Sequence, residues 1–555
     1  MQGLNSANDG DAADLPDVAF VQPDLSAALP RAITVGRLAA LFVALGVLVR
    51  LSRFLLSFPL SADEYQLAAN FLDRGFLDLL APLRHNQVAP IGFLWIEWAS
   101  LRLWGFSEWS LRFFPLVCGV ASVFAFRRMA GRLLSGVPLV FAVAIFAVAY
   151  YPIRYSAEVK PYAGDALVSL LLFSLALEWW IAPHRTKWLW CLSGVAPVAL
   201  SLSFPAAFVA GGLSLAIAYT LWRRRGLPGT RAAALAFVAF NVVVATAFLA
   251  LLSLSISAQY AATRSDMTDC WADGFPPAAP LQLLAWLASV HTSEMFAYPL
   301  GAEHGGSTLT SICFGMALLA QFRAARREMA LAIVGCFASS LIAAALHRYP
   351  YGAHARLSQY LAPAICLLTG SGAALLLARL RCSWQKIAVR AAIAACIAIG
   401  LATVVRDWVK PYSSRVDRQH RDFARRFWND APGVMTVCLS TDLHLKIYEG
   451  SFETAYLCHQ RICSPAHRRG AQAAAERIAA AKGPLRCVAF HSASARRNDQ
   501  VLTAWMEQML RDYDLVGAES HQVPLAKPES KLFEFYLMCY DVYHFRPKRN
   551  SQHAD

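Results

Sequence analysis

Long runs of apolar residues are the feature that most limits what this chain can fold into. In hydrocarbon, each backbone polar group must be bonded within its own segment, so a run of about 17 to 25 apolar residues predicts a membrane-spanning helix. Many such runs occur in the 555-residue chain, in which 57% of the residues are hydrophobic and 16% are charged. The sequence therefore predicts a polytopic α-helical membrane protein.

Eleven runs meet this criterion, and each is predicted to be one span. They lie at 36–57, 110–126, 134–152, 163–182, 188–203, 206–222, 232–256, 307–322, 328–346, 362–378 and 389–405. Basic residues follow every second run, which is typical of cytoplasmic loops. We therefore expect the other connections on the external face, namely 58–109, 153–162, 257–306, 347–361 and everything after 405.

These basic loops also account for the formal net charge of +14. A membrane protein that is oriented by cytoplasmic Lys and Arg acquires such an excess without binding a polyanion. The sequence has no nucleic-acid recognition motif and no basic stripe interleaved with aromatic residues. We expect membrane lipid as a partner and no nucleic acid.

Composition divides the chain into three regions. Residues 1–35 lack apolar periodicity and are predicted to form a disordered cytoplasmic tail, not a cleavable signal peptide. Residues 36–405 form the predicted transmembrane domain. Residues 406–555 mix short β-rich runs with helical patterns, which predicts an external α/β domain. Its expected elements are strands at 433–441, 485–492 and 531–540 and helices at 416–430 and 497–511.

The external loop 58–109 contains two further predicted helices. The stretch 88–106 is apolar, yet it carries Glu97 and Arg102, and counting it as a span would break the alternation of basic loops. We interpret it as a helix that lies in the membrane interface and is anchored by its tryptophans. The stretch 64–74 is predicted to be a shorter helix of the same kind.

Seven of the thirteen cysteines lie in or beside the predicted spans, where a thiol acts as a small hydrophobic group. Among the other six, Cys458 and Cys463 are close enough in sequence for a local disulfide in an oxidising compartment. Free buried thiols are an equally good interpretation of these six. No CxxC pair or His cluster has the spacing of a zinc site.

Four clusters of charged and aromatic residues lie in the loops expected outside the membrane. They are Asp63 and Glu64; Arg84 and His85; Arg154, Glu158, Lys160, Tyr162 and Asp165; and His347, Arg348, His354 and Arg356. Charged groups near a membrane are costly, so their presence indicates a functional site. Cations there are suited to binding a phosphate, and a partly desolvated carboxylate is suited to general-base catalysis.

Each of these signals also has a structural explanation. An Asp-Glu pair at the start of a helix often caps that helix and complements its dipole, which explains Asp63 and Glu64 equally well. A lone cation at the end of a span, such as Arg154, is usually an interfacial anchor. Tyr and Trp near a membrane edge are ordinary belt residues. The functional interpretation depends on all four clusters being on one face.

Four motifs carry a resemblance to a known family. They are ADEY at 62–65, HNQVAPIGFLWIE at 85–97, GFSEWSLRFFPLVCGV at 105–120 and RYSAEVKPYAGDAL at 154–167. Together they resemble the GT-C membrane glycosyltransferases, in particular the dolichyl-phosphate-mannose protein mannosyltransferase-like and aminoarabinose transferase-like superfamily. The similarity covers roughly 36–185 and returns weakly at YPYGAHARLSQYLAP. Lys160 stands where the family more often has Arg, and NQVAP lacks the usual proline pair.

The resemblance implies a GT-C-like fold and a glycosyltransferase of a bacterial inner membrane, with a periplasmic C-terminal domain. Such an enzyme takes a hexose or pentose from a polyprenyl-phosphate carrier and passes it to a glycan, lipid or protein on the external face. We expect inversion, with Asp63 as general base and with Glu64 either orienting Asp63 or holding a divalent cation; whether a cation is needed stays open. The other candidate residues are expected to bind the donor and its phosphate, and they are His85, Lys160, Tyr162, Asp165, Arg348 and Arg356. Glu158 is expected to position Lys160.

Two other functions are compatible with the sequence. A transporter or flippase for a lipid-linked saccharide would also need many spans with charged residues, although the chain has no internal repeat. A non-catalytic receptor or scaffold would bind its partner through the external domain and would tolerate replacement of the loop carboxylates. The sugar, the acceptor and the role of the C-terminal domain are not specified by the sequence.

Overall fold

The computed structural model describes residues 20–29, 34–71, 74–105, 107–324, 327–411, 434–440, 462–463, 483–492, 500–524 and 537–548. The chain divides into two compact units, which are described one at a time. The first unit comprises residues 1–56, 75–97 and 112–409, and the second comprises residues 57–74, 98–111 and 410–555. Most of the predicted tail, the predicted helix at 416–430 and Cys458 lie outside the described residues.

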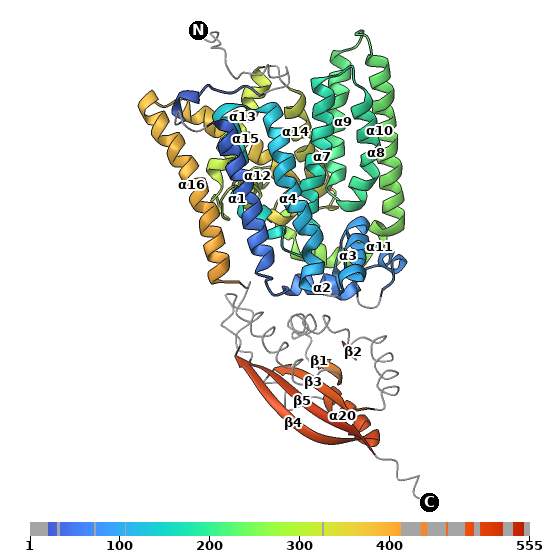
Figure 1. Cartoon of the computed structure of the whole chain (residues 1–555). Coiled ribbons are helices and arrows are strands. Elements are labelled where there is room, and N and C mark those ends of the chain that lie inside the picture. Colours follow the sequence, from blue (N-terminus) through green and yellow to red (C-terminus); the bar gives the residue numbers. More distant parts are fainter. Residues whose placement is uncertain are drawn as a thin grey trace, which may run out of the picture. The chain divides into compact units, whose positions relative to one another are not determined.

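Long helices build the first unit (Figure 1). They are α1 (Val35–Leu55), α4 (Glu108–Leu133), α5 (Gly136–Val148), α7 (Tyr162–Ile181), α8 (Lys187–Leu202), α9 (Ala206–Arg223), α10 (Thr230–Leu251), α13 (Thr308–Arg323), α14 (Glu328–Ala345), α15 (Ala362–Leu377) and α16 (Cys382–Val409). Each predicted span overlaps one of these helices. Within the described residues, eight helical segments are long and apolar enough to cross a membrane. The prediction of a polytopic membrane protein is confirmed, although α5 has only 13 residues and α8, α13 and α15 have 16 each.

Shorter elements connect these helices. They are η1 (Ser26–Ala28), η3 (Leu77–Leu80), η4 (Arg84–Asn86), α3 (Ile91–Trp104), α6 (Tyr150–Tyr155), η5 (Leu252–Ile256), α11 (Ser257–Cys270), η6 (Ala272–Gly274), α12 (Pro280–Thr292), η7 (Glu294–Phe296) and η8 (Ala355–Leu361). The stretch 88–106 does form a helix, α3, whose 14 residues are fewer than the roughly 20 that a span needs. Its interfacial position stays a prediction.

The centre of the first unit is α5. All of its residues from Val137 to Val148 are buried, as expected for a helix that is apolar on every side. It packs against α1, α15 and α16. Small residues permit this close approach, because a side chain added at Gly370 of α15 would come within 2.8 Å of Ala142 of α5.

The second unit contains α2 (Ala62–Ala68), η2 (Ala69–Phe71), α20 (Gln500–Asp512) and a sheet of β1 (Met435–Ser440), β2 (Ile462–Cys463), β3 (Leu485–Ser492), β4 (Tyr513–Pro524) and β5 (Leu537–Pro547). The strand order is β2-β1-β3-β5-β4, parallel on the β2 side and antiparallel on the β4 side. Two of the three predicted strands are confirmed. Residues 537–540 of the third belong to β5, which runs on to Pro547, and residues 531–536 lie outside the described residues. The strand β4 was not predicted.

Buried side chains hold the described part of this sheet to α20. Leu485, Cys487 and Phe545 from the strands pack with Met509 from the helix. Cys487 is a free, fully buried thiol, and burial raises its pKa well above the usual value. The α/β prediction is thus confirmed for the described residues of this region.

Candidate functional site

A buried arginine holds the break between α5 and α6. The guanidinium of Arg50, on α1, is fully buried and donates hydrogen bonds to the carbonyl oxygens of Gly46 and Ala147, both at 2.9 Å, and of Phe146 at 3.5 Å. Ala147 and Phe146 lie in the last turn of α5, where carbonyl groups lack partners within the helix. The positive charge also complements the negative end of the helix dipole. Arg50 thereby positions α6, which carries much of the candidate site.

Two cations, Arg154 in the last turn of α6 and Lys160 just after that helix, belong to the candidate site. The Arg154 Nε lies 2.5 Å from Glu158 Oε1, and although burial opposes its charge, the Glu158 carboxylate raises the pKa of Arg154 above its usual range. Lys160 is only 7% exposed, and its ammonium donates to Gln87 Oε1 at 2.7 Å. Sequence reasoning expected Glu158 to position Lys160. In the structure Glu158 pairs with Arg154, and Gln87 holds Lys160.

The carboxylate of Glu294, in η7, contacts the residues at the start of η8. The Ala355 N–H donates to Glu294 Oε2 at 3.0 Å, and the His354 Nδ1 lies 3.5 Å from the same oxygen. Hydrogen bonding to His354, to the Ala355 N–H and to the Tyr151 hydroxyl lowers the pKa of Glu294 to about 2, although partial burial opposes the shift. Glu294 therefore fixes His354 and the start of η8 close to α6.

Trp271 contacts two basic side chains at the start of η8, His354 just before the helix and Arg356 within it. The Cζ of Arg356 lies 4.3 Å from the centre of the Trp271 ring, and the ring of His354 meets the same indole edge-on at 5.0 Å. A guanidinium over an indole face is a favourable cation–π arrangement. The positive charge of Arg356 also acts on Tyr155 of α6, so η8 and α6 lie close enough to interact electrostatically.

A row of four tyrosines runs from α6 to the start of α7. Neighbouring ring centres are 5.3 Å apart for Tyr150 and Tyr151, 6.1 Å for Tyr151 and Tyr155, and 5.0 Å for Tyr155 and Tyr162. Arg406 of α16 covers the far end of the row and donates to the Tyr150 hydroxyl at 3.1 Å. This end of the first unit thus presents aromatic faces between several cations, which suits a sugar ring next to a phosphate.

The remaining predicted residues of the first unit are placed differently. Asp165 lies in the first turn of α7 and is 4% exposed, and its Oδ1 has no hydrogen-bond partner within the described residues. Arg348 is exposed, and its guanidinium stacks on the Tyr260 ring at 5.1 Å. His85 belongs to η4, and its side chain is outside the described part.

The two predicted catalytic carboxylates lie in the second unit, at the start of α2. The backbone N–H and the hydroxyl of Ser61 donate to Glu64 Oε2 at 2.9 and 3.1 Å, and the Glu64 N–H donates back to Ser61 Oγ at 3.4 Å. This reciprocal pattern is a capping box. Glu64 is 2% exposed, whereas Asp63, one residue earlier, is half-buried. The capping interpretation therefore applies to Glu64, and Asp63 stays the candidate base.

Sequence reasoning missed two residues of this site, Glu294 and Gln87, and gave no role to a third residue, Glu97. Glu294 is an isolated acid at the end of an apolar stretch, and that isolation is a signal that could have been used. Gln87 lies inside the motif HNQVAPIGFLWIE, but its side chain is uncharged. Glu97 of α3 was noted only as a departure from apolar character. It is fully buried, and neither of its carboxyl oxygens has a hydrogen-bond partner in the described part. The described residues of the chain contain no group of three or more His, Cys, Asp or Glu that could hold a metal ion.

This chain is similar in sequence and in fold to known membrane glycosyltransferases. Residues 88–250 match the family model described as dolichyl-phosphate-mannose-protein mannosyltransferase. The fold is similar to that of ArnT from Cupriavidus metallidurans bound to undecaprenyl phosphate, at 14% identity and a TM-score of 0.53, covering 92% of this chain and 98% of that one. ArnT from the same organism in the apo state gives 13% identity and a TM-score of 0.52, covering 91% and 97%. No curated protein matches. The resemblance to the GT-C class is confirmed, and the family match supports a transferase.

Proposed function

We propose that this multi-pass membrane chain, which has the fold of a GT-C glycosyltransferase, moves a sugar from a polyprenyl-phosphate carrier to an acceptor on the external face. Its setting in this proposal is a bacterial inner membrane with residues 406–555 in the periplasm. The sugar is a hexose or a pentose, and the acceptor is a glycan, a lipid or a protein.

The observation that carries this proposal is the arrangement around Lys160. It lies in the segment that matches the family model, it is almost fully buried, and a neutral side chain from the preceding loop holds it. Arg154 lies six residues earlier, and Arg356 acts on the same α6 through Tyr155. A fixed ammonium with further cations nearby is what a departing lipid phosphate needs, since negative charge builds up on it in the transition state.

The proposed reaction is one displacement at the anomeric carbon. The acceptor hydroxyl oxygen forms a bond to that carbon while the bond from the carbon to the phosphate oxygen breaks and its electron pair leaves with the phosphate. Asp63 takes the hydroxyl proton. Attack opposite the leaving group inverts the anomeric configuration.

The other candidate residues have supporting roles in this proposal. Lys160 and Arg356 bind the phosphate, with His85 and Arg348 as further candidates. Tyr162 contacts the donor sugar, and Asp165 shapes the site from within the bundle. Glu158 acts through Arg154, and Glu64 positions Asp63 by capping the helix that carries it.

The C-terminal region is proposed to select the acceptor. Residues 57–74, which carry Asp63, and residues 410–555 belong to the same compact unit, and this supports the assignment. A chain shortened after residue 411 should still bind the donor but lose its preference among acceptors. If a folded, shortened chain glycosylates the same acceptor at the same rate, this part of the proposal is wrong.

The test of the enzymatic function uses purified protein in lipid nanodiscs, a panel of polyprenyl-phosphate sugars and detection of free polyprenyl phosphate. We expect release with one donor, and a loss of about a hundredfold or more in Asp63→Asn, the usual size of a general-base contribution. Asp78→Asn is the matched control, because Asp78 is an acid of the following 3₁₀ helix, η3, where its carboxylate accepts a hydrogen bond from the Gly75 N–H at 2.9 Å.

The outcomes separate the competing functions. Donor cleavage that depends on Asp63 and not on Asp78 supports the transferase and its base. Full activity in Asp63→Asn would remove the base assignment. Movement of an intact lipid-linked saccharide across the bilayer, with no cleavage of any donor in the presence of acceptors, would support a flippase instead.

A further inference from the structure

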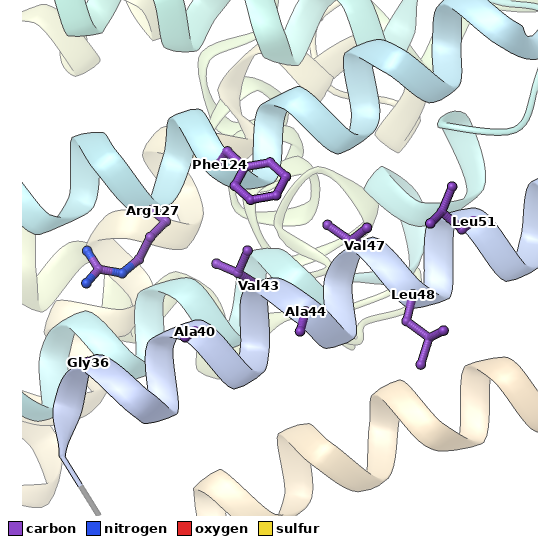
Figure 2. Close-up of a pocket in the computed structure, with 9 residues that line it drawn as sticks. All are labelled: Gly36, Ala40, Val43, Ala44, Val47, Leu48, Leu51, Phe124 and Arg127. Carbon is purple, nitrogen blue, oxygen red and sulfur yellow. The ribbon is translucent and has the colours of Figure 1, made fainter.

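An apolar groove runs along the surface of the first unit between α1 and α4, as Figure 2 shows. Its volume is about 660 Å³, and it is lined by Gly36, Ala40, Val43, Ala44, Val47, Leu48, Leu51, Phe124 and Arg127. From its first to its last residue on α1, that helix rises about 22 Å. The groove therefore has the length and character that suit an extended hydrocarbon chain lying parallel to the helices.

One cation, Arg127, lines this groove, and no carboxylate of the described residues forms an ion pair with it. Three arginines occupy the last two turns of α4, and Glu178 of α7 serves two of them: its Oε1 lies 3.7 Å from Arg128 Nη2 and 3.1 Å from Arg132 Nη2. Over the part of the chain that the structure describes, Arg127 has no carboxylate within 4 Å. The half-buried Arg127 is the one of the three that lines the groove.

The conformation of Arg127 is supported by a glycine one turn later. A Cβ atom added at Gly131 would lie 2.6 Å from Arg127 Nη1, so the guanidinium lies directly over that glycine. Figure 2 shows Arg127 on α4 near the Gly36 end of the groove, beyond Phe124. The cation is thus at one end of the groove, and the apolar surface extends from it along α1.

We propose that this groove binds one anionic phospholipid of the surrounding membrane, with an acyl chain along α1 and the phosphate at Arg127. The apolar lining requires a hydrocarbon partner, and the unpaired guanidinium requires an anion at one end. A phospholipid supplies both in one molecule. An apolar helix of a second copy would fill the groove but would offer the Arg127 guanidinium no anionic partner, whereas an anionic lipid head does. The proposal is independent of the proposed glycosyltransferase function.

The experiment uses the full chain in proteoliposomes that contain a trace of phospholipid with a photoreactive diazirine in its acyl chain. One probe has a phosphatidylglycerol head and the other a phosphatidylcholine head, and the labelled residues are mapped by mass spectrometry. We expect the anionic probe to label residues 40–51 and Phe124 about fivefold more than the zwitterionic probe, the factor that corresponds to one Arg contact with an anionic lipid.

Three variants test the assignment. Arg127→Ala should abolish the preference for the anionic probe, whereas Arg128→Ala, whose side chain is paired with Glu178, should keep it. Ala44→Trp should fill the groove and remove labelling by both probes. Ala218→Trp, at an exposed position of α9, is the control for the added indole.

The opposite results would overturn the proposal. They are equal labelling by the two probes, a preference that survives Arg127→Ala, or unchanged labelling in Ala44→Trp. A native chain that is dimeric by light scattering and becomes monomeric on Ala44→Trp would assign the groove to a second copy. Because Arg127 is not a core residue, its replacement keeps the test valid even if the tryptophan variant fails to fold.

Discussion

The ammonium of Lys160 lies 2.7 Å from the side-chain oxygen of Gln87, 73 residues earlier in the chain. The amide of Gln87 is neutral, so this hydrogen bond orients the ammonium and brings no charge of its own. The partner of the neighbouring cation is charged, since Arg154 is paired directly with the Glu158 carboxylate.

Gln87→Glu should therefore damage donor binding more than Gln87→Ala. The new carboxylate would pair with Lys160 and compete with the donor phosphate, whereas alanine only loosens the ammonium. We expect the donor KM to rise about tenfold or more in Gln87→Glu and a few-fold in Gln87→Ala, since a hydrogen bond to a charged group contributes about 1.5 to 3 kcal/mol. Steady-state kinetics over a donor series would measure this. Gln385→Glu, which adds the same charge on α16, should leave KM unchanged.

Substitutions of Glu64 and of Asp63 should have different effects on stability and activity. Glu64→Gln can still accept the Ser61 hydrogen bonds, so it should lower stability by less than about 0.5 kcal/mol and keep most of the activity. Glu64→Ala should cost about 1 kcal/mol, the usual effect of losing a helix cap. Melting midpoints and donor cleavage would both be measured. If Glu64→Gln is as inactive as Asp63→Asn, then Glu64 takes part in the chemistry and not only in capping.

Glu294 should make stability depend on pH in the acid range. Its pKa is about 2 in the folded protein against an ordinary value of 4.5. A lowered pKa means that the ionised form stabilises the fold, so the contribution is complete above about pH 5 and is lost as pH falls through the range from 4.5 toward 2. Its side chain is 18% exposed, so solvent screening limits the contribution to about 1 kcal/mol.

The measurement is the melting midpoint of the native chain and of Glu294→Gln from pH 7 to pH 3. The native chain should be more stable at pH 7, and the difference should shrink as the pH falls. Glu303→Gln removes an acid whose side chain is 64% exposed, and it should show no such difference. A difference that is constant over the whole range would mean that the Glu294 charge contributes nothing.

Arg50 should be more important for folding than any exposed arginine of the same helix. Arg50→Met removes the donors for Ala147 and Phe146 and leaves their carbonyls buried, which should cost about 3 kcal/mol. Arg50→Lys keeps the charge but not the several donors of the guanidinium, so its loss of stability should be intermediate. Thermal unfolding in detergent would report both, with Arg37→Met as the control on exposed α1 surface. Equal stability of Arg50→Met and Arg37→Met would contradict the capping role.

Local patterns account for what could be read from the sequence. Every predicted span overlaps a helix, because the need to bond all backbone groups in hydrocarbon acts within one segment. The same holds for Ser61 and Glu64, whose spacing is that of a capping box. Strands were less predictable: β5 runs to Pro547, past the expected end at residue 540, and β4 was missed, since strand formation depends on what packs across the sheet.

The sequence by itself determined the membrane character of the chain, its approximate spans and the family-like motifs. Tertiary structure alone decided which side chains meet. Glu294 reaches the Ala355 N–H from 61 residues away, and Gln87 reaches Lys160 from another loop. No periodicity encodes such pairs, because they arise when helices pack and bring loops of unrelated sequence to the same end of the bundle. The chemistry of the candidate site depends on those contacts.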